Sequence, residues 1–430
     1  MSMKPGRVTT WKLTRIILGV IALIGVISWG WLKSVEARRW SRMERRVVEL
    51  RQDAEARHGI RPVLRGTPVP GNAWDDYLKA LEIMKGLPEQ SGTSMFASRT
   101  PGSDRGKAVA TLAQLGSAVD LLQAGTRRSE CKRARISDGE PRFELGGDTQ
   151  TGRAMNLSVL AVCRARLLQD EGKIHEAVEL LLDICHFAQD FGNDGSLNSG
   201  YTGAIAFNYS ILELKELLCS GRASPEHLRQ LDRELELIDA SFPRSGTALR
   251  GELESFGELL LNGQFIRSFA IKPGTSLHPY DRPSWRHAFS SRLMMTSAFD
   301  QADAWMARLQ DADLGSRIEE RRVWNEYTQE IRASENLYNG LFSSILTNTA
   351  SDARREWRTR LRLIRTAVHY YATNEILELE DPFGSKLLHA EGSDRLKIWG
   401  VGLNGKDDGG KGEWPNIVLS DIVLEVPRRP

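Results

Sequence analysis

The distribution of apolar and charged residues sets one segment apart from the rest of the chain. Residues 16–32, from Ile16 to Leu32, contain no charged side chain and stand between Arg15 and Lys33. An α-helix rises about 1.5 Å per residue, so this segment would be roughly 25 Å long, the short end of what crosses a bilayer core. No comparable segment follows, so the pattern predicts one transmembrane anchor and a large remainder outside the membrane.

The same segment is open to a second interpretation, that of a cleaved signal peptide. A signal peptide ends in small residues, whereas this segment ends Trp29-Gly30-Trp31-Leu32. Tryptophan is typical of the boundary between lipid headgroups and hydrocarbon. We therefore expect a retained signal-anchor behind a basic N-terminal tail, residues 1–15. Four Lys or Arg precede the anchor and six occupy residues 33–46, so the positive-inside rule alone would leave the remainder in the cytoplasm.

Beyond the anchor, apolar residues recur at the three-and-four spacing of amphipathic helices. Residues 33–60 predict a helical stalk, and residues 61–371 predict an all-helical body. Within the body, Asn72 is expected to cap one helix, and Ser224 to cap another that has Pro225 in its first position. The expected fold class is mainly α.

A pair of helices joined by a tight turn is predicted within this body. Apolar stripes over residues 155–170 and 173–191 face each other across Glu171-Gly172. The run from Glu171 to Ala177 resembles the turn and second helix of a tetratricopeptide repeat, and the resemblance covers residues 157–191. No further repeats can be recognised in the sequence, so the resemblance implies a body of helical hairpins and not a regular repeat array.

After residue 371 the pattern changes to that of strands. Residues 396–401 and 417–426 are β-rich and are separated by a loop of Gly, Asn and Asp, which predicts a two-stranded ribbon in a C-terminal module, residues 372–430. Asp381-Pro382-Phe383-Gly384, the run from Ile398 to Gly410, and Ser420-Asp421-Ile422 follow in order. Together they resemble the C-terminal region of the major pseudopilins of type II secretion, and the ending of many uncharacterised membrane-anchored bacterial proteins.

The resemblance has implications for chemistry and for location. The equivalent loop of those pseudopilins binds calcium, which implies a calcium site at Asn404, Asp407, Asp408 and Asp421; a solvated acidic turn is the alternative. It also implies that the module lies outside the cytoplasm, the opposite of what the flanking charges indicate. The apolar helix begins Arg15-Ile16-Ile17-Leu18-Gly19 and lacks a pilin-type start, so assembly into a pseudopilus is not expected.

Composition and charge give no case for nucleic-acid binding. The chain of 430 residues has 58 Lys and Arg against 56 Asp and Glu, and its first 46 residues hold ten of the cations and two glutamates. The remainder is therefore slightly acidic. The arginines of residues 38–46 could contact anionic headgroups or belong to a solvated stalk. Of four cysteines, Cys163 and Cys185 fall on successive predicted helices and are either free thiols or a bridge.

Enzyme motifs are incomplete in this chain. His175-Glu176-Ala177-Val178-Glu179 comes within one residue of the zinc motif H-E-x-x-H but has glutamate in place of the second histidine. The run from Gly405 to Lys411 has the glycines and lysine of a P-loop, but Gly412 replaces the Ser or Thr and Pro415 opposes the required helix. No G-x-S-x-G elbow occurs.

These patterns together predict a single-pass protein of a bacterial inner membrane with its body on the outer face. The helical body is expected to be a non-catalytic scaffold or interaction domain for a protein or envelope partner, and the lipid bilayer is contacted through residues 16–32. The alternative is an envelope hydrolase whose site is assembled from residues far apart in the helical body. A deep cleft with convergent carboxylates would favour the hydrolase, and a shallow groove would favour the interaction domain.

Overall fold

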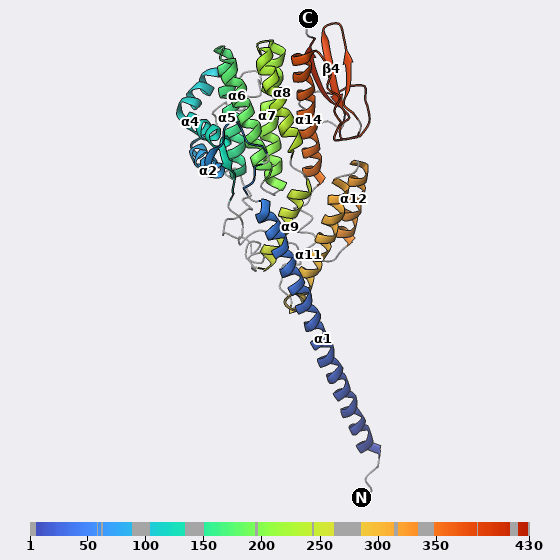
Figure 1. Ribbon diagram of the computed structural model, residues 1–430. Helices are drawn as coiled ribbons and strands as arrows, with labels where there is room; N and C mark the ends of the chain where they lie inside the picture. Colours follow the sequence, from blue (N-terminus) through green and yellow to red (C-terminus); the bar gives the residue numbers. More distant parts are fainter. Residues whose placement is uncertain are drawn as a thin grey trace.

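The computed structural model describes residues 6–57, 59–61, 63–87, 104–133, 150–193, 197–242, 245–261, 285–313, 317–333, 348–384, 386–412 and 420–428. Within these ranges the protein is mainly helical, with a small sheet near the C-terminal end. Figure 1 shows a helical body at one end of a long projecting helix, with the N-terminus at the far tip of that helix.

Helix α1 (Gly6–Arg57) is the projecting helix and continues without a break for 52 residues (Figure 1). It includes a segment long and apolar enough to cross a membrane, and none of that segment is buried against the rest of the protein. The large apolar side chains from Ile16 to Trp31 are exposed, most of them by half or more. The structure therefore contains the long N-terminal apolar helix that the sequence predicts.

The part of the body at the top of Figure 1, farthest from the N-terminus, is a set of helices around one apolar core, called the upper core. Its members are α2 (Ala73–Ile83), the 3-10 turn η1 (Met84–Gly86), α4 (Arg105–Thr126), α5 (Gln150–Asp170), α6 (Ile174–Gly192), α7 (Leu197–Ser220), α8 (Pro225–Ala240) and α14 (Asn348–Thr373). Aromatic rings fill its centre, with Tyr77 and Phe187 in edge-to-face contact at 4.8 Å between centroids. Two short strands, β1 (Val69–Asn72) and β2 (Arg128–Glu130), pair in parallel at its edge.

Local sequence signals locate several of these helices correctly. The predicted hairpin is present as α5 and α6, and Gly172 between them has φ +78°, a conformation that favours glycine. The side chain of Asn72 accepts a hydrogen bond from the Trp74 N–H and caps α2. Ser224 caps α8 by accepting from the His227 N–H, with Pro225 in the first turn as expected.

A second apolar core lies nearer to the projecting helix. The last turns of α1 pack there with α9 (Ser245–Leu261), α11 (Trp285–Asp313) and α12 (Arg317–Ala333). Met43, Val47 and Leu50 of α1 are each 4% exposed or less. Residues 33–57 are thus helical, as the predicted stalk requires. The turns that contain Met43, Val47 and Leu50, however, form part of a bundle and do not stand free in solvent.

The C-terminal module contains a three-stranded antiparallel sheet in the order β3-β4-β5, so the prediction of two strands was wrong. The strands are β3 (Leu388–Glu391), β4 (Arg395–Gly400) and β5 (Ile422–Pro427). β3 was missed because it is four residues long, mostly exposed, and contains no β-branched residue. Leu396, Ile398, Leu424 and Val426 face α14 and join the upper core. Residues 417–419 of the predicted second strand and residues 334–347 of the predicted helical body lie outside the described residues.

Candidate functional site

The loop between β4 and β5 contains all four residues of the predicted calcium site. Asp421, the residue before β5, is 3% exposed. Its carboxylate accepts hydrogen bonds from the Asp408 N–H (3.0 Å to Oδ2) and the Gly410 N–H (2.7 Å to Oδ2). A carboxylate that accepts backbone N–H groups in this way fixes the path of a glycine-rich loop. In this geometry the Asp421 carboxylate holds the loop closed.

The other three predicted ligands lie on the same loop and pair with neighbouring donors. Asn404 Nδ2 donates to Asp408 Oδ2 at 2.7 Å. Asp407 Oδ1 accepts from Trp399 Nε1 at 3.0 Å and from the Gly409 N–H at 2.9 Å. In the part of the chain that the structure describes, no three His, Cys, Asp or Glu side chains converge as a metal site. Residues 413–419 of this loop lie outside that part, and calcium binding stays a prediction.

Asp381, from the Asp-Pro-Phe-Gly motif, joins the C-terminal module to α14. Its Oδ1 accepts from Thr359 Oγ1 at 3.0 Å and from the Phe383 N–H at 3.1 Å. Arg355 Nη1 donates to the Pro382 carbonyl at 2.6 Å. Burial raises the pKa of Asp381 to about 6, an effect that the hydrogen bonds from Phe383 and Thr359 reduce. The sequence identified the motif but not its position against α14.

A row of ionisable side chains follows one face of α6. Glu179, Asp183, His186 and Asp190 are spaced by four, three and four residues, which places them on the same side of a helix. His186 Nε2 lies 3.1 Å from Glu234 Oε2 of α8. The acidic residues among them are covered by three arginines, Arg61, Arg65 and Arg127. Asp183 and Asp190 are buried and Glu179 is half-buried, and carboxylates neutralised by arginines in this way hold elements together and are poorly placed to meet a substrate.

Arg61 and Arg65 lie on the segment that connects α1 to the body. Arg65 makes ion pairs with Glu179 at 2.8 Å, with Asp183 at 3.3 Å and with Glu234 at 3.0 Å, and its side chain is 3% exposed. Burial alone would lower the pKa of Arg61, but the charge and hydrogen bond of Asp190 together with Tyr77 and Cys131 outweigh it, and the pKa is raised. These contacts fix the connecting segment against α6 and α8.

No residue of this row is predicted from the sequence as part of a site. The available signal was the recurrence of acidic residues at helical spacing on α6, a helix whose other positions are almost all buried. The H-E-x-x-E run belongs to its first turns: His175 is exposed and stacks on His227 with 5.5 Å between ring centroids, whereas Glu179 turns inward to Arg65.

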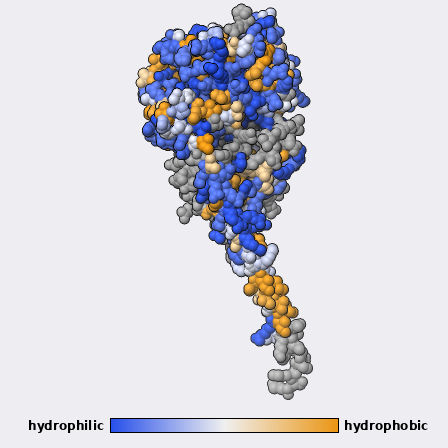
Figure 2. Space-filling view, viewed as in Figure 1, coloured by the Kyte–Doolittle hydropathy of each residue, from blue (hydrophilic) through white to orange (hydrophobic). Residues whose placement is uncertain are grey.

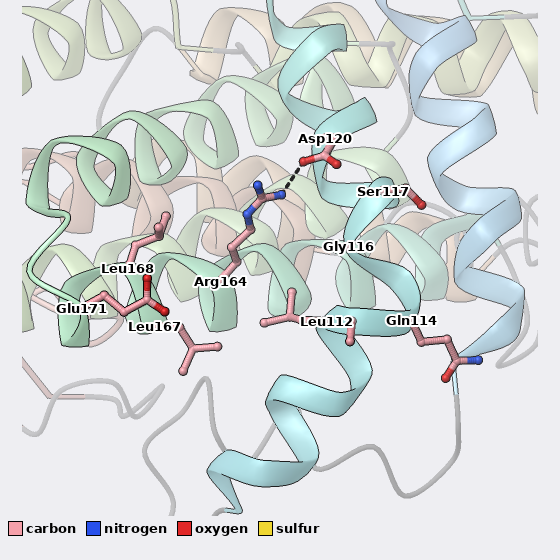
Figure 3. A pocket seen from close by; sticks show the side chains of 10 residues that line it. Leu112, Gln114, Gly116, Ser117, Asp120, Arg164, Leu167, Leu168 and Glu171 are labelled. Carbon is pink, nitrogen blue, oxygen red and sulfur yellow. Dashed lines mark hydrogen bonds and ion pairs between the residues drawn. The ribbon is translucent and has the colours of Figure 1, made fainter.

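A shallow groove of about 490 Å³ lies between α4 and α5. Figure 3 shows Leu112 of α4 near Leu167 and Leu168 of α5, beneath an ion pair that joins the two helices. The pair is Arg164 with Asp120, at 2.5 Å. The groove is open to solvent and combines apolar and charged side chains, features that suit contact with another protein better than enclosure of a small substrate.

Comparison of the chain with protein-family models, curated proteins and solved structures found no match.

Proposed function

We propose that the protein is a membrane-tethered helical scaffold that presents its body to a protein or envelope partner of a bacterial inner membrane. One observation supports this most directly. The exposed apolar segment of α1 and the turns buried in the second core belong to a single unbroken helix. Figure 2 shows the apolar band on α1 and the hydrophilic surface that begins where the bundle starts. A body held by a continuous helix keeps a fixed distance and orientation relative to the bilayer.

The groove between α4 and α5 is the proposed contact surface for the partner. A photoreactive amino acid at Leu112 or Leu167, both in the groove, is expected to give a crosslinked species in living cells. The same substitution at Leu237, which is 48% exposed on α8, serves as the control and should give none. Crosslinks of equal yield at all three positions would argue against the groove. Release of soluble cell-wall fragments by the purified protein would support the alternative, an envelope hydrolase.

The proposed location of the body is the outer face of the inner membrane. It rests on the resemblance of the C-terminal module to pseudopilins, against the basic residues that follow the anchor. Protease added to intact spheroplasts should digest the body while a cytoplasmic marker protein survives. Digestion only after lysis would place the body in the cytoplasm.

Calcium binding by the β4–β5 loop is the second part of the proposal. It is supported by the presence of Asn404, Asp407, Asp408 and Asp421 on one loop that Asp421 closes. Calcium at 100 times its dissociation constant would stabilise the folded protein by about 2.7 kcal/mol, seen as a rise in melting temperature. Asp407→Asn, which keeps the shape of the side chain, should reduce that rise, and Asp394→Asn on an exposed turn should not. An unchanged melting temperature in the parent protein would exclude the site.

A further inference from the structure

The part of α1 that directly follows the apolar segment has two faces of opposite character. One face is buried and includes Glu36, Met43 and Val47, all less than 10% exposed, and Met43 and Val47 pack in the second core. The opposite face carries Arg38, Arg42 and Arg45, which are exposed and spaced by four and three residues. Because this is the repeat of one helical face, the three guanidinium groups form a row along α1.

This row borders a depression in the protein surface. The depression has a volume of about 350 Å³ and is lined by Ala37, Arg38, Ser41, Arg42 and Arg45. Its lining therefore contains three guanidinium groups and one hydroxyl, and no carboxylate. Guanidinium groups donate paired N–H bonds in a geometry that matches the oxygens of a phosphate group. The chemistry of the lining fits a phosphate-bearing anion.

None of the three arginines of this row forms a close ion pair in the part of the chain that the structure describes. There, neighbouring cations on other faces have carboxylate partners, as with Lys33 and Glu36 at 2.7 Å and Arg46 and Asp303 at 3.0 Å. For Arg38 the described contact is donation from Nε to the Ser34 carbonyl at 3.3 Å. Arg42 and Arg39 act on the carboxylate of Asp300 on α11. Burial raises the pKa of Asp300, and the two arginines partly offset that rise. Among described residues no carboxylate lies within 4 Å of the arginines of the row.

The position of the row along α1 relates it to the lipid headgroups. Arg38 lies six residues beyond Leu32, about 9 Å along the helix axis, and Arg42 lies about 15 Å beyond it. The apolar segment is roughly 25 Å long and the hydrocarbon core is about 30 Å thick, so the bilayer thins or the flanking residues approach it. Long arginine side chains also extend toward the interface. With α1 inserted as proposed, the end of the depression at Arg38 therefore lies nearest the headgroup layer.

We propose that the depression lined by Ala37, Arg38, Ser41, Arg42 and Arg45 binds the phosphate group of an anionic phospholipid. This inference rests on the proposed insertion of α1 into a membrane. The bound lipid would hold the bundle at the membrane surface on the side of α1 that its own helices leave uncovered. Three guanidinium groups favour a lipid of net negative charge over a neutral one, and the expected preference is at least about tenfold.

The test uses the full chain purified in a neutral detergent and titrated with fluorescent phosphatidylglycerol or phosphatidylcholine. Phosphatidylglycerol is expected to bind at least about tenfold more tightly. The variant Arg38→Gln with Arg42→Gln and Arg45→Gln should lose this preference. A matched control carries Arg229→Gln, Arg233→Gln and Arg395→Gln, which are exposed arginines on α8 and β4, and should keep it. Lysine at the three positions of the row should retain only part of the preference, because it keeps the charge without the paired donors.

Flotation of the full chain with vesicles of phosphatidylcholine separates this inference from the proposed insertion. The parent protein and the glutamine variant should both float, since the apolar segment is unchanged. A parent protein that does not float would overturn the insertion and the lipid site together. Flotation with equal binding of the two lipids, or a glutamine variant that keeps its preference, would overturn the lipid site alone. Displacement of phosphatidylglycerol by inorganic phosphate at equal concentration would identify a free anion as the ligand and also overturn it.

Discussion

Arg61 and Asp190, which lie 129 residues apart in the chain, form a two-point ion pair inside the helical body. Nε lies 2.9 Å from Oδ1 and Nη2 lies 2.6 Å from Oδ2, and the two side chains are 1% and 6% exposed. Arg61 Nη1 also donates to the carbonyls of Thr126 and Arg128 at 2.9 and 2.5 Å, and the Tyr77 hydroxyl donates to Asp190 at 2.6 Å. Burying two charges is costly unless such partners satisfy them. The pair therefore fixes the segment that follows α1 to α6 with defined geometry.

Replacing Asp190 by asparagine should destabilise the body severely. The change leaves the Arg61 guanidinium buried without its counter-charge, and breaking one side of a buried pair costs about 3–5 kcal/mol. Thermal unfolding of the full chain in detergent measures the effect. Glu171→Gln removes an exposed carboxylate that pairs with Lys173 at 2.8 Å, and it should leave unfolding unchanged. Equal losses in the two variants would show that the Arg61–Asp190 pair has no special structural role.

The close approach of α9 to α1 makes a second prediction, at Gly257. A Cβ atom there would lie 2.3 Å from Val47 Cγ2 and 2.8 Å from Phe299 Cε2. Gly257→Ala is therefore expected to lower the free energy of unfolding by about 1–3 kcal/mol through overpacking. Gly116→Ala on α4, where nothing lies within 4 Å of the added Cβ, should instead raise it by about 0.5–1 kcal/mol, the usual gain in helix propensity.

A double variant distinguishes overpacking from a general weakening of α9. Val47→Ala removes the methyl group nearest to the new Cβ, so Val47→Ala with Gly257→Ala should lose less stability than the two single changes added together. Losses that add without coupling would show that α1 and α9 are not in the close contact that Gly257 allows. This contact matters for the proposed tether because it joins α1 to the bundle.

The sequence predicts those features whose signals are local. The uncharged segment of α1, the glycine turn at Gly172 and the Ser224-Pro225 start of α8 each occupy a few consecutive residues, and each is present in the structure. The four residues of the predicted calcium site likewise fall on one loop. Which N–H each carboxylate accepts could not be predicted, because a hydrogen bond depends on the folded path of the loop.

Long-range pairing accounts for what the sequence does not predict. The arginines that pair with the acidic residues on α6 lie 52 to 129 residues away along the chain, Arg61 being the most distant. The second core brings Met43 of α1 together with helices near residues 250, 300 and 325. The packing of β3 beside β4 depends on pairing more than on the composition of β3 itself. Such contacts produce no periodic pattern of residues within a single segment, so the sequence of that segment does not predict them.

The last prediction concerns pH and follows from the buried carboxyl of Asp381. Burial raises its pKa from 3.8 to about 6 in the folded protein. Between about pH 4 and pH 6 the folded protein therefore keeps a proton that the unfolded chain has released, and the free energy of unfolding falls as the pH rises through this range. A shift of about two units corresponds to roughly 3 kcal/mol, lost by pH 7 and present near pH 4.

Asp381→Asn should remove this dependence, because the amide keeps an oxygen for the donors Thr359 and Phe383 and does not ionise. Unfolding of the parent protein and the variant is measured from pH 4 to pH 7, and the difference between them is compared, so that other titrating groups cancel. The difference should grow in favour of the variant as the pH rises and should level off above about pH 6. Asp394→Asn, an exposed carboxylate in the turn before β4, should follow the parent protein throughout. A difference that stays constant across the range would show that Asp381 titrates at its ordinary pKa and that burial against α14 does not control its ionisation.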